Sequence, residues 1–228
     1  MNPVLIDELL KISLVLLVIL TTIIISRRNL VSLINVYSLH SLVLSFIAIL
    51  FFLSEGNYTF LFAAALTIIS KSVLIPILLR WTKWHMKIFT DIEYHYLKPV
   101  SSIFVSLLII IFSFFIFSKI KDYLGLSSLY YFGVIIGFSL VMIGFMIIFS
   151  RRKIIVKIIG YLVMENGVVL LSLFIGEMPL LIEMMVLMDL LVLVAITCIL
   201  GFGMDSSMEE FHKKLNPFHN WFNRRAKK

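Results

Sequence analysis

Seven runs of about 20 apolar residues make up most of this chain, and each is long enough to cross the hydrocarbon core of a bilayer as one helix. The runs are residues 4–25, 30–53, 58–80, 100–118, 129–150, 154–175 and 179–200. Inside lipid, backbone groups must find partners within the protein, and a helix satisfies them within one segment. The sequence therefore predicts an all-α, polytopic membrane protein with seven transmembrane helices.

The composition agrees with a membrane protein. Of the 228 residues, 61% are hydrophobic and the mean hydropathy is +1.07, which leaves too little polar surface to cover a water-soluble globule. Cys198 is the single cysteine, so an intrachain disulfide is excluded and thiolates are too few for an iron–sulfur cluster held by this chain. We expect no cofactor, no metal and no catalytic residue in the chain itself.

The net charge of +7 is distributed unevenly. In a seven-span arrangement, the basic residues at 27–28, 80–98, 151–153 and 201–228 fall on one side, and the loops of the other side carry only Lys119 and Lys121. By the positive-inside rule this predicts an outside N-terminus and a cytoplasmic C-terminus, in the plasma membrane of a prokaryote. Trp81 and Trp84 fit an aromatic belt at the cytoplasmic interface. The pattern indicates contact with the lipid bilayer and argues against nucleic acid.

Two basic corners suggest an internal repeat. Ser26-Arg27-Arg28 followed by Tyr37 matches Ser150-Arg151-Arg152 followed by Tyr161 at a constant offset. Helices one to three would then correspond to helices five to seven in parallel orientation, although arginine pairs also end many unrelated membrane helices. The predicted organisation is an N-terminal three-helix region (1–81), a surface loop and connector helix (82–128), a second three-helix region (129–200) and a basic tail (201–228).

Four titratable side chains lie near the middle of otherwise apolar runs: His40, Lys71, Glu165 and Asp189. An ionisable group at that depth must face a counter-charge, a protein interior or water, so it is a candidate functional residue. Lys157, Tyr161 and Glu165 follow one another at steps of four, which places them on one helix face like a proton entry path. The alternative is that Lys157 extends its ammonium to the interface and Glu165 is a packing residue.

Lys71 has two interpretations, as a switchable charge in a pump or as a fixed counter-ion to Glu165 or Asp189. Pro76 has no N–H, so the carbonyl of Ser72 loses its helical donor beside this lysine, and we expect a kink or a bound water there.

His40 is flanked by serines and either relays protons or is a packing histidine. A haem with two histidine ligands would need another histidine at depth, and the remaining four lie in the predicted loop and tail. Glycines 133, 137 and 144 share one helix face, as do 160 and 167, which predicts close helix packing. Glu183 is assigned to an interface.

The stretch from 160 to 167, Gly-Tyr-Leu-Val-Met-Glu-Asn-Gly, followed by Glu183 and Asp189, resembles the hydrogenase-4 component E family of membrane-bound [NiFe] hydrogenase and formate hydrogenlyase-type complexes. Residues 37–44 and 70–76 are also similar. In that family the last three helices resemble the complex I K subunit and the C subunit of multisubunit cation/proton antiporters. The resemblance implies that Glu165 and Asp189 act in proton translocation.

The chain departs from these relatives in two places. The complex I carboxylate lies about one helical turn earlier, where this chain has Leu162, and Asp189 is shorter than the usual glutamate.

The predicted function is that of a membrane subunit, non-catalytic alone, in a hydrogenase or respiratory complex I-like oxidoreductase, contributing to proton or sodium translocation. Its expected partners are antiporter-like subunits and quinone-module or hydrogenase-module subunits. The alternatives are a self-sufficient ion carrier, an assembly-only scaffold and a haem-bearing quinol anchor.

Overall fold

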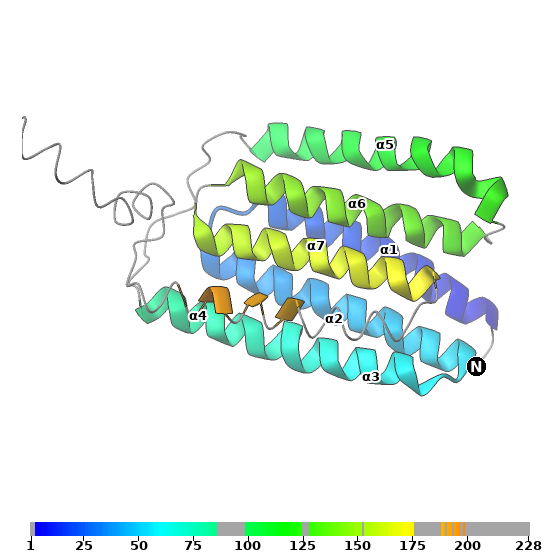
Figure 1. The fold of residues 1–228 in the computed structure, drawn as a ribbon, viewed down its shortest axis with the longest axis horizontal. Coiled ribbons are helices and arrows are strands. Elements are labelled where there is room, and N and C mark those ends of the chain that lie inside the picture. Colours follow the sequence, from blue (N-terminus) through cyan, green and yellow to red (C-terminus); the bar gives the residue numbers. More distant parts are fainter. Residues whose placement is uncertain are drawn as a thin grey trace, which may run out of the picture.

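In the computed structural model, long helices lie side by side along a common direction (Figure 1). The structure describes residues 3–85, 99–124, 128–151 and 153–175, together with 188–189, 191–192, 194–196 and 198. The helices are α1 (Pro3–Ser26), α2 (Leu30–Glu55), α3 (Tyr58–Thr67), the π-helix η1 (Ile68–Leu74), α4 (Ile75–His85), α5 (Pro99–Leu124), α6 (Ser128–Ser150) and α7 (Ile154–Ile175).

Asparagine and glycine set where the second span begins and ends and where the third span begins. The Asn29 side chain accepts a hydrogen bond from the Val31 N–H at 2.9 Å, and Asn57 accepts one from the Thr59 N–H at 3.0 Å. Each cap satisfies a backbone donor that has no partner within the helix. α2 ends at Gly56, whose φ of 70° is a left-handed conformation that glycine adopts without strain.

Six of the helical segments are long and apolar enough to cross a membrane, as predicted: Val4–Ser26, Leu30–Glu55, Tyr58–Trp84, Pro99–Lys119, Ser128–Ser150 and Ile154–Ile175. The predicted seventh run, 179–200, lies mostly outside the described residues, and those of its residues that the structure does describe are helical. The parallel repeat therefore stays a prediction.

The helices continue beyond two of the predicted boundaries. The third span runs to His85, so the start of the predicted surface loop is helical, and the Thr82 hydroxyl bonds to the Leu78 carbonyl there. The connector helix extends to Leu124, beyond the predicted end at 118. Charged residues at the membrane surface do not end a helix, because its backbone bonds do not depend on the apolar run.

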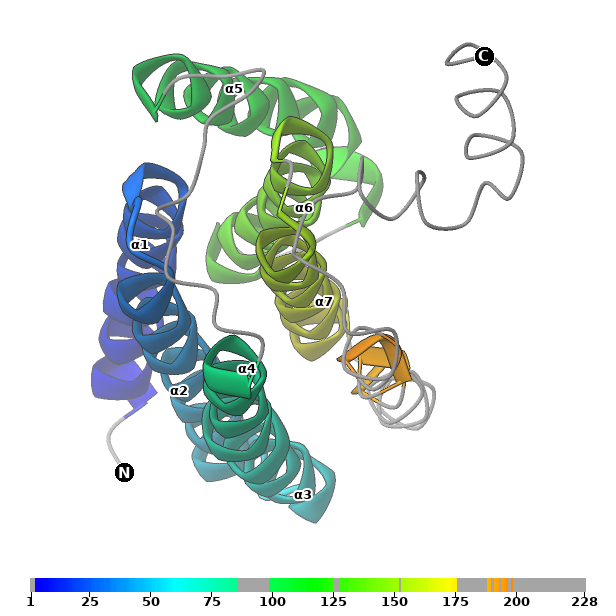
Figure 2. The same ribbon diagram turned by 90° about the vertical axis from the view of Figure 1, so that its left-hand side faces the viewer.

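The glycines allow α6 and α7 to approach closely, as predicted. A Cβ added at Gly144 would lie 2.6 Å from the backbone nitrogen of Met164, and one at Gly167 would lie 2.7 Å from that of Val141. Any side chain at these positions would push the two helices apart. Viewed from the end, α6 and α7 lie together, facing α1 and α2, while α5 lies at the edge (Figure 2).

Candidate functional site

The buried apolar side chains form two separate clusters, one above the other along the helices. The α3-side cluster includes Val43 of α2, Ala64 of α3 and Val169 of α7. The α4-side cluster includes Tyr37 of α2 and Val163 of α7, together with residues of α4.

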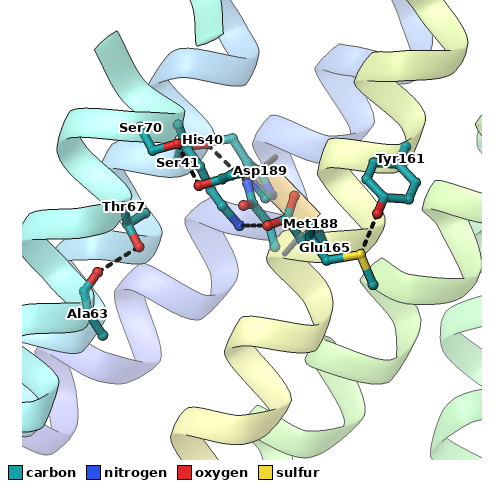
Figure 3. Close-up of polar contacts among 11 residues, drawn as sticks. His40, Ser41, Ala63, Thr67, Ser70, Tyr161, Glu165, Met188 and Asp189 are labelled. Atoms are coloured by element: carbon teal, nitrogen blue, oxygen red, sulfur yellow. Dashed lines mark hydrogen bonds and ion pairs between the residues drawn. The ribbon is translucent and has the colours of Figure 1, made fainter. Parts of the chain in front are cut away.

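Polar side chains occupy the level between the two clusters, and we call this set the polar layer. Its members are Thr21, His40, Ser41, Thr67, Ser70, Lys71, Glu165, Asn166 and Asp189. All except the half-buried Ser70 are buried. The four titratable residues predicted at depth therefore lie in one layer, and Figure 3 shows several of them converging between the helices.

Lys71 and Glu165 form an ion pair inside the bundle. The Lys71 Nζ lies 2.6 Å from Glu165 Oε1, and the two side chains are 0% and 2% exposed. Apart from this pair, neither group makes a hydrogen bond to another described residue. Of the two counter-ions that the sequence left open for Lys71, the structure selects Glu165. The pair is expensive to break, because an unpartnered charge would remain in a medium of low dielectric.

Asp189 contacts Ser70, the residue that precedes Lys71 in the chain. Its Oδ2 accepts a 2.5 Å hydrogen bond from the Ser70 hydroxyl, and its Oδ1 has no partner among the described residues. Asp189 and Lys71 are both within electrostatic range of Glu165. Adjacent residues of one helix, Ser70 and Lys71, thus contact one carboxylate each. Figure 3 shows the contact between Ser70 and Asp189.

The π-helix η1 carries both Ser70 and Lys71. In η1 the Ile75 N–H bonds to the Ser70 carbonyl, five residues earlier, which widens the turn. Such a bulge interrupts the regular backbone pattern in a membrane helix and so needs compensating partners. A kink or a bound water was expected near Pro76, and the structure has a π-helical turn directly before this proline.

A side chain of α2 compensates for the missing donor of Pro76. The Ser38 hydroxyl donates to the Ser72 carbonyl at 2.6 Å, and the two hydroxyl oxygens are 3.3 Å apart. The sequence predicts a kink or a water at this carbonyl, and it does not show that Ser38 is the partner. The signal was the serine at mid-span in α2, whose partner only the packing of the two helices reveals.

His40 is bound on both sides of its ring. Its Nε2 lies 3.2 Å from the Thr21 hydroxyl of α1, and its Nδ1 lies 3.1 Å from the amide nitrogen of Asn166 of α7. The same amide nitrogen lies 3.1 Å from the hydroxyl of Ser41. Thr21 and Asn166 were not predicted as site residues.

Of the predicted entry path of Lys157, Tyr161 and Glu165 along α7, only a part contacts the polar layer. The Tyr161 hydroxyl donates to the sulfur of Met188, beside Asp189. Lys157 is half-buried, and its side chain has no hydrogen bond or ion pair with another described residue. The predicted interface residue Glu183 lies outside the described residues.

Tyr37 is a buried polar residue that sequence analysis did not single out as a site residue. Its side chain is 0% exposed, and its hydroxyl has no standard hydrogen bond within the described structure. It lies near Ser41 and within electrostatic range of Glu165 and Asp189. Its position one turn from Ser41 on α2 was the available signal.

The charges of the polar layer do not balance. Its described members include two carboxylates and one ammonium, so the ionised layer carries one excess negative charge in the middle of the bundle. Low dielectric makes such an excess costly, and one added proton or monovalent cation would neutralise it. No group of three His, Cys, Asp or Glu side chains in the described part of the chain is placed to hold a metal ion.

Comparison with known proteins identifies no relative: no family model, no curated protein and no solved structure matches the chain.

Proposed function

We propose that this chain is a membrane subunit of a multisubunit hydrogenase or respiratory complex I-like oxidoreductase, in which its polar layer contributes to redox-coupled translocation of protons or sodium ions. The observation that carries the proposal is the excess carboxylate: deep inside the bundle, Glu165 pairs with the single ammonium of the layer, that of Lys71, while Asp189 bonds to Ser70 and lies within electrostatic range of Glu165. A site with room for one more positive charge can take up and release an ion.

The resemblance of residues 160–167 to hydrogenase-4 component E supplies the oxidoreductase context of the proposal. The proposed route uses Glu165, Asp189 and Lys71, with Lys157 and Tyr161 leading to them along α7. The proposal includes a seventh span, a prokaryotic plasma membrane and a cytoplasmic C-terminal tail. The electron-transfer chemistry belongs to the partner subunits.

Purification in mild detergent tests the assembly. We expect antiporter-like subunits and a hydrogenase or quinone-module subunit to co-purify with the chain. A chain that purifies alone and gives ion flux in liposomes would be a self-sufficient carrier instead. A haem absorption band would favour the quinol-anchor alternative.

The Glu165→Gln variant tests the mechanism in membrane vesicles that contain the assembled complex. We expect electron transfer to continue while the ion uptake that it drives is abolished, because the amide keeps the shape of the side chain and cannot exchange a proton. The matched control is Ser172→Ala on the same helix, since among the described residues the Ser172 hydroxyl bonds only to the Val168 carbonyl. Normal ion uptake by an assembled Glu165→Gln complex would leave the chain a scaffold role only.

A further inference from the structure

Thr21 fixes the direction of the hydrogen bonds around His40. Its hydroxyl lies 2.7 Å from the carbonyl oxygen of Leu17, which can only accept, so the hydroxyl hydrogen is committed to that carbonyl. The Nε2 of His40, 3.2 Å from the same hydroxyl oxygen, must therefore be the donor of that contact. It follows that Nε2 carries the hydrogen of the imidazole.

Asn166 completes this assignment from the other side of the ring. Its amide nitrogen lies 3.1 Å from His40 Nδ1 and can only donate, so Nδ1 presents a lone pair. The second amide hydrogen reaches the Ser41 hydroxyl at 3.1 Å. In a neutral ring with its hydrogen on Nε2, turning the amide over would set the amide oxygen against the Nδ1 lone pair, so this tautomer and this orientation of Asn166 go together.

The resulting chain of donors runs from Asn166 through His40 and Thr21 to the Leu17 carbonyl, and it ends there. A backbone carbonyl passes no proton onward, and a primary amide neither takes up nor releases one under ordinary conditions. The direction of the bonds therefore gives a proton no path through His40.

We propose that His40 is a positioning residue, held neutral as its Nε2–H tautomer, and that with Asn166 it aims Glu165 at Lys71. Successive helix residues point about 100° apart. Anchoring Asn166 to α2 therefore turns Glu165 away from α2, toward the third span, where it meets the ammonium of Lys71 at 2.6 Å. A positioning role takes the place of the proton-relay role, one of the two roles that the sequence left open for His40. The inference rests on the proposed function only in taking ion translocation as the process that Glu165 and Lys71 carry out.

The network joins three helices through groups that have almost no exposure. Thr21 lies on α1, His40 and Ser41 on α2 and Asn166 on α7, and each is at most 1% exposed. Asn166 Oδ1 has no partner among the described residues, but the other donors and acceptors of this network are paired, and rotating any of the three helices would break those bonds.

Nitrogen-15 NMR of the full chain, labelled at its histidines, tests the tautomer. The chain has five histidines, and the His40 signals are those that disappear in His40→Gln. We expect a protonated Nε2 and an unprotonated Nδ1 at neutral pH. An imidazolium, or a hydrogen on Nδ1, would overturn the inference.

Two substitutions separate positioning from proton relay in the assembled complex. His40→Gln cannot be protonated but still offers an acceptor to Asn166 and a donor to Thr21, so it should retain most redox-driven ion uptake. His40→Leu offers neither and should lower uptake about tenfold, the factor that corresponds to one net hydrogen bond. Loss of uptake in an assembled His40→Gln complex would restore the relay role and reject the inference.

These outcomes are distinct from a failure of the proposed function. If the wild-type complex shows no uptake that depends on Glu165, the proposed function is wrong, and the tautomer spectrum still decides the inference about His40. If His40→Leu does not assemble, the spectrum and the His40→Gln variant remain decisive.

Discussion

The Ser38 hydroxyl lies 2.6 Å from the carbonyl oxygen of Ser72 and donates a hydrogen bond that Pro76 cannot supply. This contact joins α2 to the π-helical turn that carries Lys71. Ser38 on α2 thus satisfies the carbonyl that Pro76 leaves without a donor on the neighbouring helix, at the same depth as the charged residues.

The Ser38→Ala variant should lower the free energy of unfolding by about 1–3 kcal/mol, because a buried carbonyl loses its donor. In a Pro76→Ala background the same change should have an effect below about 1 kcal/mol, since the restored N–H can bond to the Ser72 carbonyl. Unfolding in detergent followed by circular dichroism measures both. Equal effects in the two backgrounds would show that Ser38 does not compensate for the proline.

The Lys71→Met variant should destabilise the chain by about 3–5 kcal/mol, because Glu165 is left as an unpartnered buried charge. A double variant, Lys71→Met with Glu165→Met, should recover most of this loss, since two apolar side chains need no counter-charge. The same unfolding assay gives the coupling between the two sites, with Ser172→Ala as the neutral control. Additive effects in the double variant would argue against a direct ion pair.

Gly144→Ala should destabilise the bundle by about 1–3 kcal/mol, because the new Cβ would lie 2.7 Å from the Cα of Met164, and backbone cannot rotate away. Gly133→Ala should have a smaller effect, since the nearest atoms there are ring carbons of the Phe174 side chain. Thermal denaturation of both variants compares them. A larger loss of stability in Gly133→Ala than in Gly144→Ala would indicate that α6 and α7 are farther apart at Met164 than they are in the structure.

Asn29→Ala should lower stability by about 1 kcal/mol, because the first turn of α2 loses its side-chain cap. Asn29→Asp keeps an acceptor at the same place and should be close to the wild type. A denaturation midpoint unchanged by Asn29→Ala would mean that water replaces the cap at this end of the helix.

Six of the seven predicted spans, and the depth of the charged residues within them, could be read from the sequence, because both follow from the lengths of the apolar runs. Lys71 and Glu165 were identified in this way, as was the missing donor at Pro76. The close approach of α6 and α7 was also predictable, since glycine has no side chain to separate two helices.

The partners were not predictable, because pairing depends on how each helix is rotated about its axis. In a membrane protein the lipid-facing side and the core-facing side are both apolar, so periodicity does not tell them apart. Ser38, Thr21 and Asn166 were missed for this reason. Each is one polar residue among many, and its meaning appears only when the neighbouring helix is placed.

The Lys71–Glu165 pair also constrains how the protein is made. Helices enter the membrane one after another during synthesis, and a lone lysine or aspartate at the centre of an inserting helix costs about 2.5–3.5 kcal/mol. Lys71 emerges from the ribosome long before Glu165. Until α7 brings the opposite charge, the third helix must either stay at the translocon or be held in the membrane by the hydrophobicity of the residues that flank Lys71. Formation of the ion pair is therefore also the step that fixes how the newly synthesised helices pack.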